Sequence, residues 1–589
     1  MKYSDVFVRW LEDLGYTHCF YVAGGNVMHL LESASHVFEC VPVVHEVSAG
    51  IAAEYFNESQ GKNGKKAFAL VTAGPGLTNI VTAMAGAFLE SRDLLVIGGQ
   101  VKSTDLSHGK VRQLGIQEID GMTLVSSLTV ASLQIQKPLP RNEIQKVVLS
   151  GLSPRKGPVF IEFCLDAQGA EFQDIESKPK EESQLSTNTF SLSEQLSAEI
   201  RNSKRPVLLV GGGVSRETAK KAQDLLENSP IPVMTTWNGT DRISSDAKSY
   251  FGRPNTWGQR SANVILQQSD LLIALGTRLG LQQSGFNWEQ FMPIGKIIQV
   301  DIDPTELDKK NPGIDYPIEA NANEVLPPVL DFLDSERNNA SWKSWVEFSA
   351  SVKASLPTSE NVNKTKGPFI NPYEFYIALS EVLKDGDAVV PSSSGASETV
   401  AMQSLNQGRE NTVITTKGLA SMGYGLAGAI GTAFAGAPRV FHVEGDGGFA
   451  QNIQELGTVA ANKLNIKTFL LCNDGYASIR MTQKSYFDGH YLGCDASTGL
   501  GLPDWHLLAK SFGISSTELD PEADLKAEIE RAVALEGPQV ILVPINPDQT
   551  YFPKITSQID ERGNLISNPI HLMTPELSTE MSNKVFRYI

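Results

Sequence analysis

The chain has 589 residues, with 50 Lys and Arg against 67 Asp and Glu, which gives a net charge of −17. A chain of this length exceeds one hydrophobic core and predicts about three or four domains. Its 41% hydrophobic and 20% charged residues exclude a disordered or fibrous protein. The negative charge, without any basic cluster, argues against a nucleic-acid partner.

The cysteines and the apolar segments predict in which cellular compartment the chain lies and whether it enters a membrane. The five cysteines form no C-x-x-C pair, so we predict a reduced, cytoplasmic chain. Residues 1–16 predict an amphipathic helix without the apolar stretch of a signal peptide. Residues 418–437 are uncharged and long enough to span a bilayer, but they are mostly Gly and Ala, which favours a packed internal helix. We therefore expect no membrane partner.

The first third of the chain alternates strand-like and helical patterns. Apolar runs at 18–24, 67–74, 94–100 and 158–163 predict parallel strands joined by crossover helices. We assign residues 1–170 to the first domain. The polar residues 171–195 are predicted to be a linker.

The same alternation occurs twice more. Strands are predicted at 205–213, 232–236, 270–278 and 296–304, and then at 387–395, 439–448, 468–476 and 539–545. These define a middle domain (196–335) and a third domain (371–555), with a linker around one short helix at 336–370 and a tail at 556–589. The fold class is therefore α/β, with three consecutive doubly wound parallel-sheet domains.

Two glycine-rich loops in the third domain form the sharpest local signal. Glu444-Gly445-Asp446-Gly447-Gly448 and Asn473-Asp474-Gly475 both follow apolar strands, and 473 − 446 = 27 residues allow one crossover between them. A carboxylate beside an amide oxygen suits Mg²⁺, and glycines let backbone N–H groups approach a diphosphate. The alternative to a magnesium and diphosphate site is that these are two ordinary glycine-rich turns with Asx caps.

These residues resemble the signature of the thiamine diphosphate (ThDP)-dependent enzymes, in which GDG is followed some 25–30 residues later by asparagine. The resemblance implies a pyrimidine-binding first domain, a flavin-type middle domain and a diphosphate-binding third domain. It implies that Asp446, Asn473 and the carbonyl of Gly475 hold Mg²⁺. The ThDP-binding residues that it implies are Gly25, Glu46, Thr72, Pro75, Asn79, Ser394, Gly395, Ala396, Ser397, Ala420, Met422, Gly445, Gly447, Gly448, Asn473, Gly475, Tyr476 and Ala477.

Glu46 follows a strand end and opens a helix of small residues. By itself, such a carboxylate is more often a partner of the helix dipole. By the resemblance, Glu46 is the catalytic glutamate that contacts the aminopyrimidine and starts proton transfer, secluded from water. The resemblance also implies that the first domain of one chain faces the third domain of another, in a homodimer or homotetramer.

The motif order is similar to that of the acetolactate (acetohydroxyacid) synthase branch. In that branch the glutamine of a Phe-Gln-Glu motif reaches into the site, which makes Gln117 the second catalytic candidate. The middle domain resembles the FAD-binding domain of the branch; the alternative is a vestigial domain that binds ADP or nothing. The FAD residues implied are Gly211, Gly212, Gly213, Thr236, Trp237, Gly276, Arg278, Asp301, Ile302 and Asp303.

Two positions depart from that branch. Gln282 stands where the synthases carry an arginine that binds the carboxylate of the acceptor, and Thr482 stands where they carry a tryptophan that helps select larger keto acids. A neutral amide cannot replace a guanidinium–carboxylate pair. We therefore expect a carboligase that decarboxylates pyruvate or a similar 2-keto acid and transfers the acyl-anion equivalent to a carbonyl acceptor without that carboxylate, such as an aldehyde, a ketone or a nucleotide-linked keto sugar. The alternatives are a genuine acetolactate synthase and an inactive cofactor-bound scaffold.

Overall fold

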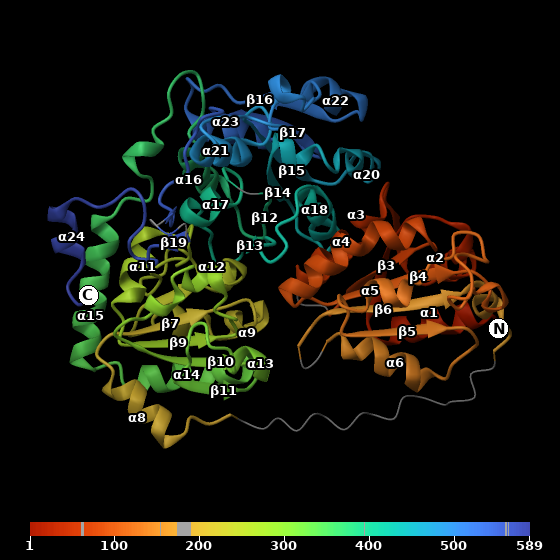
Figure 1. Ribbon diagram of the computed structural model, residues 1–589, viewed down its shortest axis with the longest axis horizontal. Helices are drawn as coiled ribbons and strands as arrows, with labels where there is room; N and C mark the ends of the chain where they lie inside the picture. The colour runs from red at the N-terminus through yellow and green to blue at the C-terminus, as the bar shows by residue number, and fades with distance from the viewer. Residues whose placement is uncertain (60–63, 153–154, 173–189, 394, 560–561, 563–564) are drawn as a thin grey trace.

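The computed structural model describes residues 1–589 except 60–63, 153–154, 173–189, 394, 560–561 and 563–564. Three parallel β-sheets lie in three separate lobes, each flanked by helices (Figure 1). This arrangement confirms the predicted fold class of three consecutive parallel-sheet domains.

The first domain has a six-stranded sheet in the order β2-β1-β3-β4-β6-β5. Its strands are β1 (Tyr16–Tyr21), β2 (Glu39–Pro42), β3 (Lys66–Val71), β4 (Leu94–Gln100), β5 (Ala131–Ile135) and β6 (Pro158–Cys164). Its helices are α1 (Tyr3–Asp13), α2 (Met28–Ser35), α3 (Glu46–Glu58), α4 (Pro75–Glu90), α5 (Gly121–Val125), α6 (Arg141–Ser150) and α7 (Leu165–Gly169). The strand order reverses between β1 and β3, where a doubly wound sheet opens its ligand crevice.

The third domain repeats this topology, in the order β13-β12-β14-β15-β17-β16. Its strands are β12 (Ala388–Pro391), β13 (Thr412–Val413), β14 (Val440–Gly445), β15 (Ile466–Cys472), β16 (Ser515–Glu518) and β17 (Gln539–Pro544). Its helices are α16 (Pro372–Val382), α17 (Thr399–Ser404), α18 (Tyr424–Phe434), α19 (Asp446–Phe449), α20 (Leu456–Ala461), α21 (Ala477–Tyr486), α22 (Trp505–Ser511) and α23 (Leu525–Val533). The order reverses between β12 and β14, directly beneath the predicted diphosphate loops.

The middle domain has a five-stranded sheet in the order β11-β10-β9-β7-β8. Its strands are β7 (Pro206–Val210), β8 (Val233–Thr235), β9 (Leu271–Leu275), β10 (Lys296–Asp301) and β11 (Tyr316–Glu319). Its helices are α8 (Glu194–Asn202), α9 (Arg216–Lys221), α10 (Gln223–Glu227), α11 (Arg260–Gln267), α12 (Leu281–Ser284), α13 (Pro304–Leu307), α14 (Ala322–Ser335) and α15 (Ala340–Ser355). Here the order reverses between β7 and β9.

The linker at 336–370 was predicted to surround one short helix, and the structure has a helix there, the 16-residue α15. Trp342 and Trp345 of this helix are buried in the two cores of the middle domain, and the indole N–H of Trp345 donates to the carbonyl oxygen of Pro206 at 3.1 Å. Helix α15 therefore belongs to the middle domain. The predicted linker at 171–195 lies mostly outside the described residues.

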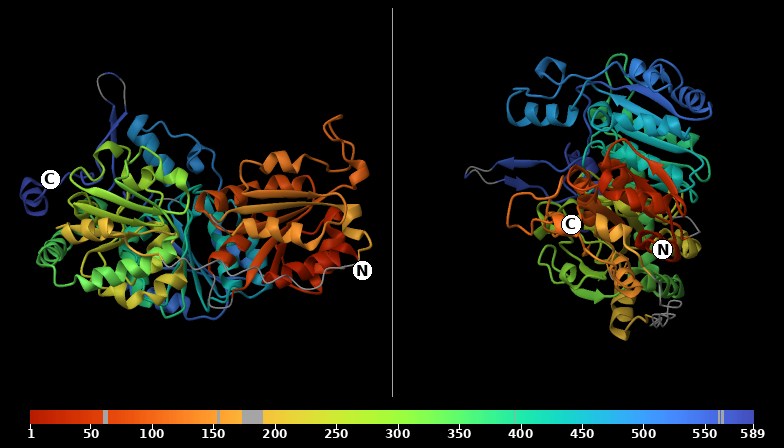
Figure 2. Two further views of the ribbon diagram at one scale, coloured as in Figure 1. Left: turned by 90° about the horizontal axis from the view of Figure 1, so that it is seen from below. Right: turned by 90° about the vertical axis from the view of Figure 1, so that its right-hand side faces the viewer.

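The C-terminal tail also packs on the middle domain. It forms the antiparallel hairpin β18 (Ser557–Ile559) and β19 (Leu565–Ser567), followed by α24 (Thr579–Val585). Figure 2 shows this hairpin projecting from the body of the molecule. Val585 lies in the same core cluster as Trp345. No helix in the described part of the chain combines the length and the apolar character needed to cross a membrane.

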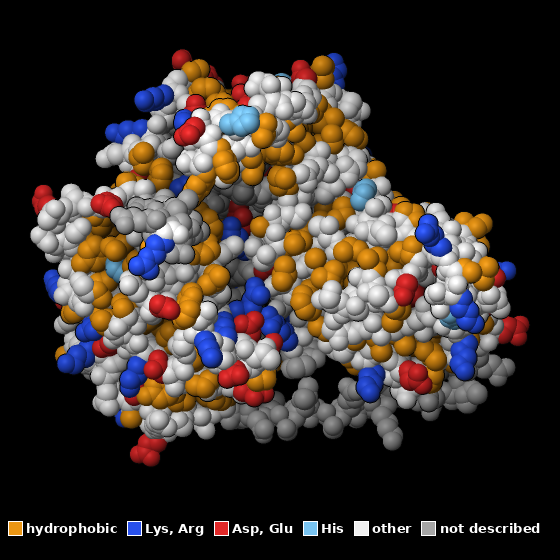
Figure 3. Space-filling model, viewed as in Figure 1, with side chains coloured by type: hydrophobic (Ala, Val, Ile, Leu, Met, Phe, Trp, Pro, Cys, Tyr) orange, Lys and Arg blue, Asp and Glu red, His pale blue; other side chains and the backbone are white. Residues whose placement is uncertain are grey.

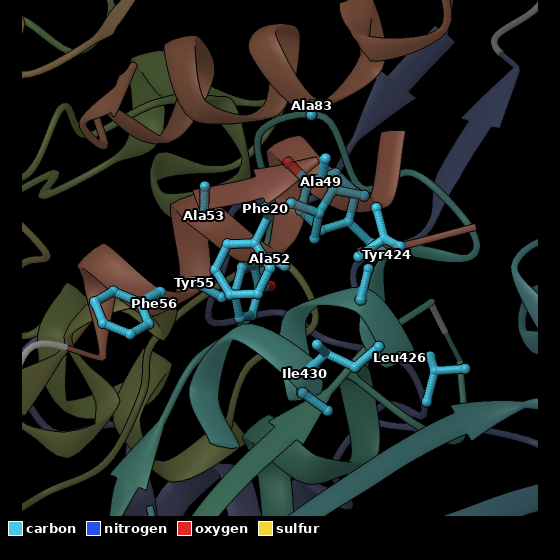
Figure 4. Close-up of a cluster of buried hydrophobic side chains, with 14 of the residues drawn as sticks. Phe20, Ala49, Ala52, Ala53, Tyr55, Phe56, Ala83, Tyr424, Leu426 and Ile430 are labelled. Atoms are coloured by element: carbon cyan, nitrogen blue, oxygen red, sulfur yellow. The ribbon is translucent and has the colours of Figure 1, made fainter. Parts of the chain in front are cut away.

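Helices of the first and third domains pack closely within this one chain. The small residues of α3 lie against α18, so that a Cβ added to Gly431 would come 2.0 Å from the carbonyl oxygen of Ala52. Figure 4 shows Ala49, Ala52 and Tyr55 facing Tyr424 and Ile430 in the shared core. Within this single chain the first and third domains therefore pack against each other, and their facing each other across two chains stays a prediction.

Buried charges join all three domains. Arg216 of the middle domain donates to Glu58 at the end of α3 at 2.6 Å and to the carbonyl oxygen of Val413 in the third domain at 3.3 Å. Burial alone would raise the pKa of Glu58, but Arg216 and Arg92 outweigh it and lower that pKa to about 2. Figure 3 shows charged side chains gathered where the lobes meet. The helix that begins with Glu46 is thus fixed at its far end by ion pairs.

Candidate active site

Asp446 lies at the carboxyl end of β14, buried as the first residue of α19. Its carboxylate accepts the backbone N–H groups of Gly447 at 2.7 Å, Asn473 at 3.1 Å and Gly475 at 3.2 Å. Burial raises the pKa of Asp446 to about 6, although these hydrogen bonds lower it. The carboxylate is therefore held rigidly at the point where the two glycine-rich loops meet.

The three predicted magnesium ligands converge. The amide oxygen of Asn473, as it is placed, lies 3.1 Å from Oδ1 of Asp446 and 3.0 Å from the carbonyl oxygen of Gly475. Turning the amide over would make its NH₂ group donate to both atoms. Octahedral ligands at about 2.1 Å from Mg²⁺ lie about 3.0 Å from their neighbours. The three oxygens as placed therefore fit a magnesium ion.

The described residues offer no second metal site built from His, Cys, Asp or Glu side chains. Among the residues that the structure describes, no three His, Cys, Asp or Glu side chains gather into a metal-binding group. A hard cation would therefore depend on the mixed set of one carboxylate, one amide and one carbonyl oxygen, with places left for phosphate oxygens.

The glycines around Asp446 leave no room for side chains. A Cβ on Gly447 would lie 2.5 Å from the ring of Tyr476, and one on Gly448 would lie 2.7 Å from Cβ of Ser393. Gly475 has a φ of +118°, which favours glycine. Gly445, in contrast, faces open space. The loops therefore expose backbone beside a free volume, as a diphosphate site requires.

The opposite loop of the crevice follows β12. Gly395 and Ala396 lie there, and the Ser397 hydroxyl donates to the carbonyl oxygen of Ser392 at 2.6 Å. Ala477, at the start of α21, is buried. Ser394 is outside the described residues. The structure thus brings this loop to the same sheet edge as Asp446.

Glu444 is a site residue that the sequence did not single out. Its buried carboxylate accepts the Ser393 hydroxyl at 2.5 Å and the Gly423 N–H at 3.1 Å, and it lies 3.0 Å from Nε2 of His442. It therefore ties the diphosphate loop to the segment that carries Met422. Its position in the motif Glu-Gly-Asp-Gly-Gly was the only available signal.

The segment before α18 points outward. Met422 is 39% exposed, and Ala420 has a φ of +53°. A methionine that filled the core would be buried, so the exposure of Met422 agrees with the ThDP-binding role that the resemblance implies rather than with core packing.

Glu46 is the first residue of α3 and is 9% exposed. Nδ2 of Asn79 donates to its Oε2 at 2.9 Å. His45 caps the helix by accepting the Val47 N–H at 3.2 Å, which is a structural role. The Glu46 carboxylate is therefore both secluded and oriented by a second predicted site residue.

Glu455 connects Glu46 to the third domain. This buried carboxylate, in the short helix Ile453–Glu455, accepts the backbone N–H groups of Val44 at 3.1 Å and His45 at 3.0 Å. The segment before Glu46 is thus bonded to the chain that follows the Asp446 loop. No local pattern in the sequence indicates Glu455, because the backbone N–H groups that it accepts lie more than 400 residues away in the chain.

The other first-domain candidates surround the β1–β3 crevice. Gly25 faces open space, and a Cβ on Gly24 would collide with Thr72. Pro75 begins α4. Gln117 is exposed, has a φ of +64° and lies directly over Gly74.

Glu118 holds the loop that carries Gln117. It accepts the N–H groups of Ser107 at 2.6 Å and Leu114 at 2.8 Å. Burial raises the pKa of Glu118, but these and further hydrogen bonds bring it down to about 2. The loop is therefore anchored by an ionised carboxylate, with Gln117 at its surface.

The predicted flavin loops meet at the β7–β9 crevice. A Cβ on Gly211 would lie 2.2 Å from the carbonyl oxygen of Gly276, and one on Gly213 would lie 2.8 Å from Cα of Gly276. A Cβ on Gly212 would lie 3.1 Å from Asn238, which follows Thr236 and Trp237. Arg278 is exposed just beyond this contact. The glycine loops and the arginine thus occupy the expected edge.

Other flavin candidates are engaged elsewhere. The carboxylate of Asp303 accepts a hydrogen bond from Nη1 of Arg155 at 2.6 Å, and it caps α13 by accepting the backbone N–H of Thr305. Asp301 is buried, and Ile302 is half-buried. Trp237 is buried in a cluster with third-domain residues, and its Nε1 has no hydrogen-bond partner among the described residues. The residues therefore fit a flavin diphosphate at the glycine loops better than they fit a flavin contact at Asp303, which Arg155 already engages.

Comparisons with known proteins agree with this geometry. Residues 1–124 match the model of the thiamine pyrophosphate enzyme N-terminal TPP binding domain, residues 193–329 match the central domain, and residues 393–543 match the C-terminal TPP binding domain. The chain belongs to the thiamine pyrophosphate enzyme family.

Curated relatives narrow the class. The chain is 30% identical to the acetolactate synthase large subunit of Corynebacterium glutamicum, over 95% of this chain and 89% of that protein. It is 29% identical to the acetolactate synthase isozyme 1 large subunit of Escherichia coli (94% and 95%), and 27% identical to acetolactate synthase 1, chloroplastic, of Zea mays (94% and 87%). It is a ThDP-dependent enzyme of the acetolactate synthase-like type.

Proposed function

We propose that this enzyme decarboxylates pyruvate, or a similar 2-keto acid, and transfers the remaining acyl unit to a carbonyl acceptor. The observation that carries the proposal is the joining of Glu46, through Glu455, to the domain in which Asp446, Asn473 and Gly475 converge. The chemistry that ThDP supplies when bound is a nucleophilic carbon that also takes up the negative charge left by decarboxylation.

The protein's own residues have separate roles in the proposal. Asp446, Asn473 and Gly475 would hold Mg²⁺, and the N–H groups of Gly447 and Gly448 would face the diphosphate. Asn79 occupies Oε2 of Glu46, which leaves Oε1 to hold and release the proton. The low exposure of Glu46 excludes water from that exchange. Gln117 would reach the substrate from its anchored loop.

We propose FAD as a further cofactor, with its diphosphate between the loops after β7 and β9. The collision of any Cβ at Gly211 or Gly213 with Gly276 supports this placement. Arg278, exposed beside these loops, supplies a cation for the diphosphate.

We also propose a homodimer or homotetramer in the cytoplasm. Val111, Leu114 and Ile116 expose apolar side chains on the loop of Gln117, and a second copy would cover them. The five cysteines are all free, which favours a reducing compartment.

A genuine acetolactate synthase is the second candidate, favoured by the names of the curated relatives. Against it stand Gln282, half-buried on α12, and Thr482, whose hydroxyl donates to the carbonyl oxygen of Ser478 at 3.0 Å. Neither side chain carries a charge for an acceptor carboxylate.

Incubation of the holoenzyme with labelled pyruvate and a panel of aldehydes and ketones tests the proposal. We expect two-carbon adducts of a non-carboxylate acceptor, detected by mass, and little acetolactate from pyruvate alone. Rapid formation of acetolactate would favour the second candidate. Inertness toward every 2-keto acid would leave only a cofactor-bound scaffold.

A further inference from the structure

Lys554 lies between the third and middle domains, close to the diphosphate loop. Three residues earlier, the ring of Tyr551 would touch a Cβ on Gly395 at 3.0 Å. One residue later, the N–H of Ile555 donates to the carbonyl oxygen of Thr256 in the middle domain at 2.8 Å. The ammonium Nζ of Lys554 is 3.5 Å from Sδ of Met481 on α21. The side chain is therefore placed beside the site rather than on a remote surface.

The ammonium group has no anionic partner in the described part of the chain. Its neighbours are the sulfur of Met481 and the ring of Phe552, whose centroid is 5.2 Å from Nζ. Burial lowers the pKa of Lys554, and no carboxylate opposes that effect. Lys484, on the same helix as Met481, has Asp548 at 3.4 Å. A half-buried cation without a counter-ion is costly unless a ligand supplies the charge.

The two positions that depart from the synthase pattern flank this lysine. The carbonyl oxygen of Gln282 accepts the Thr256 N–H at 2.9 Å, and Thr256 in turn accepts from Ile555. On the other side, Met481 directly precedes Thr482. Backbone hydrogen bonds therefore connect the segment of Lys554 to Gln282, and the contact of its ammonium group with Met481 places it next to the residue that precedes Thr482.

We propose that Lys554 binds a phosphate group of the acceptor substrate. The inference rests on the proposed function and names its acceptor class: a phosphorylated aldehyde or ketone whose anionic group lies away from the reacting carbonyl. A lysine is a point charge that suits phosphate, whereas the carboxylate of a 2-keto acid is best held by a bidentate arginine. Trp257 and Phe286 pack edge-to-face nearby, and Phe286 is exposed, so an apolar part of the acceptor has a surface to contact.

The test compares D-glyceraldehyde 3-phosphate with D-glyceraldehyde as acceptors, with pyruvate as donor and the holoenzyme as catalyst. We expect the wild type to prefer the phosphorylated acceptor in kcat/KM. Lys554→Met should lower that preference by about 10- to 100-fold, as expected for losing a charged hydrogen bond, mainly through KM. Lys554→Arg should restore most of it.

Lys484→Met is the matched control, because it removes a nearby positive charge that already has a partner; both rates should stay at the wild-type level. Pyruvate consumption without a phosphate preference, or a preference that survives in Lys554→Met, would overturn the role of Lys554 while the proposed function stands. Absence of pyruvate consumption with any acceptor would instead remove the proposed function, and this inference with it.

Discussion

Replacing Glu46 with glutamine is expected to lower pyruvate consumption by about 10²- to 10⁴-fold, the usual contribution of a positioned acid–base group. Glutamine keeps the shape of the side chain and can still contact Asn79, but it cannot exchange a proton at Oε1. The measurement is steady-state pyruvate consumption at saturating ThDP and Mg²⁺.

The control for Glu46→Gln is Glu12→Gln, which removes an exposed carboxylate of α1 in the same domain. Both variants should unfold near the wild-type temperature, since among the residues that the structure describes the Glu46 side chain makes one hydrogen bond, from Asn79, that would weaken. Turnover of Glu46→Gln at the wild-type rate would reject the proton-transfer role.

Replacing Asp446 with asparagine is expected to weaken magnesium binding by more than about 100-fold and to abolish turnover at low Mg²⁺. The variant loses the one carboxylate among the three converging oxygens, and its NH₂ group would meet backbone N–H groups that now donate to Asp446. Turnover measured across a magnesium titration gives the apparent affinity.

Asp474→Asn is the matched control for that titration. Asp474 lies in the same loop, is exposed, and has a φ of +62°, which asparagine tolerates. Its magnesium dependence should equal that of the wild type. An unchanged midpoint for Asp446→Asn, with an unfolding temperature near that of the wild type, would contradict the assignment of Asp446 as a ligand.

The central strands of the three parallel sheets could be predicted from the sequence, whereas of the described edge strands only β8, predicted at 232–236, could. In the parallel sheets, the described strands that the apolar runs missed are β2, β5, β11, β13 and β16, and every one lies at the edge of its sheet. The tail hairpin of β18 and β19 was missed as well. In a central strand both faces are buried, which gives a continuous apolar run, whereas an edge strand such as Ser515–Glu518 is largely exposed. Composition therefore marks the interior of a parallel sheet and not its borders.

Site residues at strand ends could be predicted because parallel strands deliver their loops to one edge. Asp446 and Asn473 were placed together on this basis, and the structure brings them into contact. Glu455 and Glu444 were missed because their roles come from contacts with Val44 and Gly423, which no local spacing encodes. The same limit applies to Lys554, whose neighbours come from three separate segments.

The domain boundary at residue 336 shows a different limit. Polar residues between Ser335 and Ile370 favoured a linker, but Trp342 and Trp345 occupy helical positions that bury them under β7 and its neighbours. A helix was expected in this segment, but the average polarity of the segment conceals its burial, which depends on a few large side chains.

Calorimetric titration of ThDP into the purified, cofactor-free chain, with and without Mg²⁺, is the most direct test. The convergence of Asp446, Asn473 and Gly475 predicts saturable uptake of one ThDP per chain when magnesium is present, and greatly weakened uptake when it is absent. No heat of binding under either condition, from a protein that is folded by its unfolding transition, would contradict the assignment of this crevice as a coenzyme site.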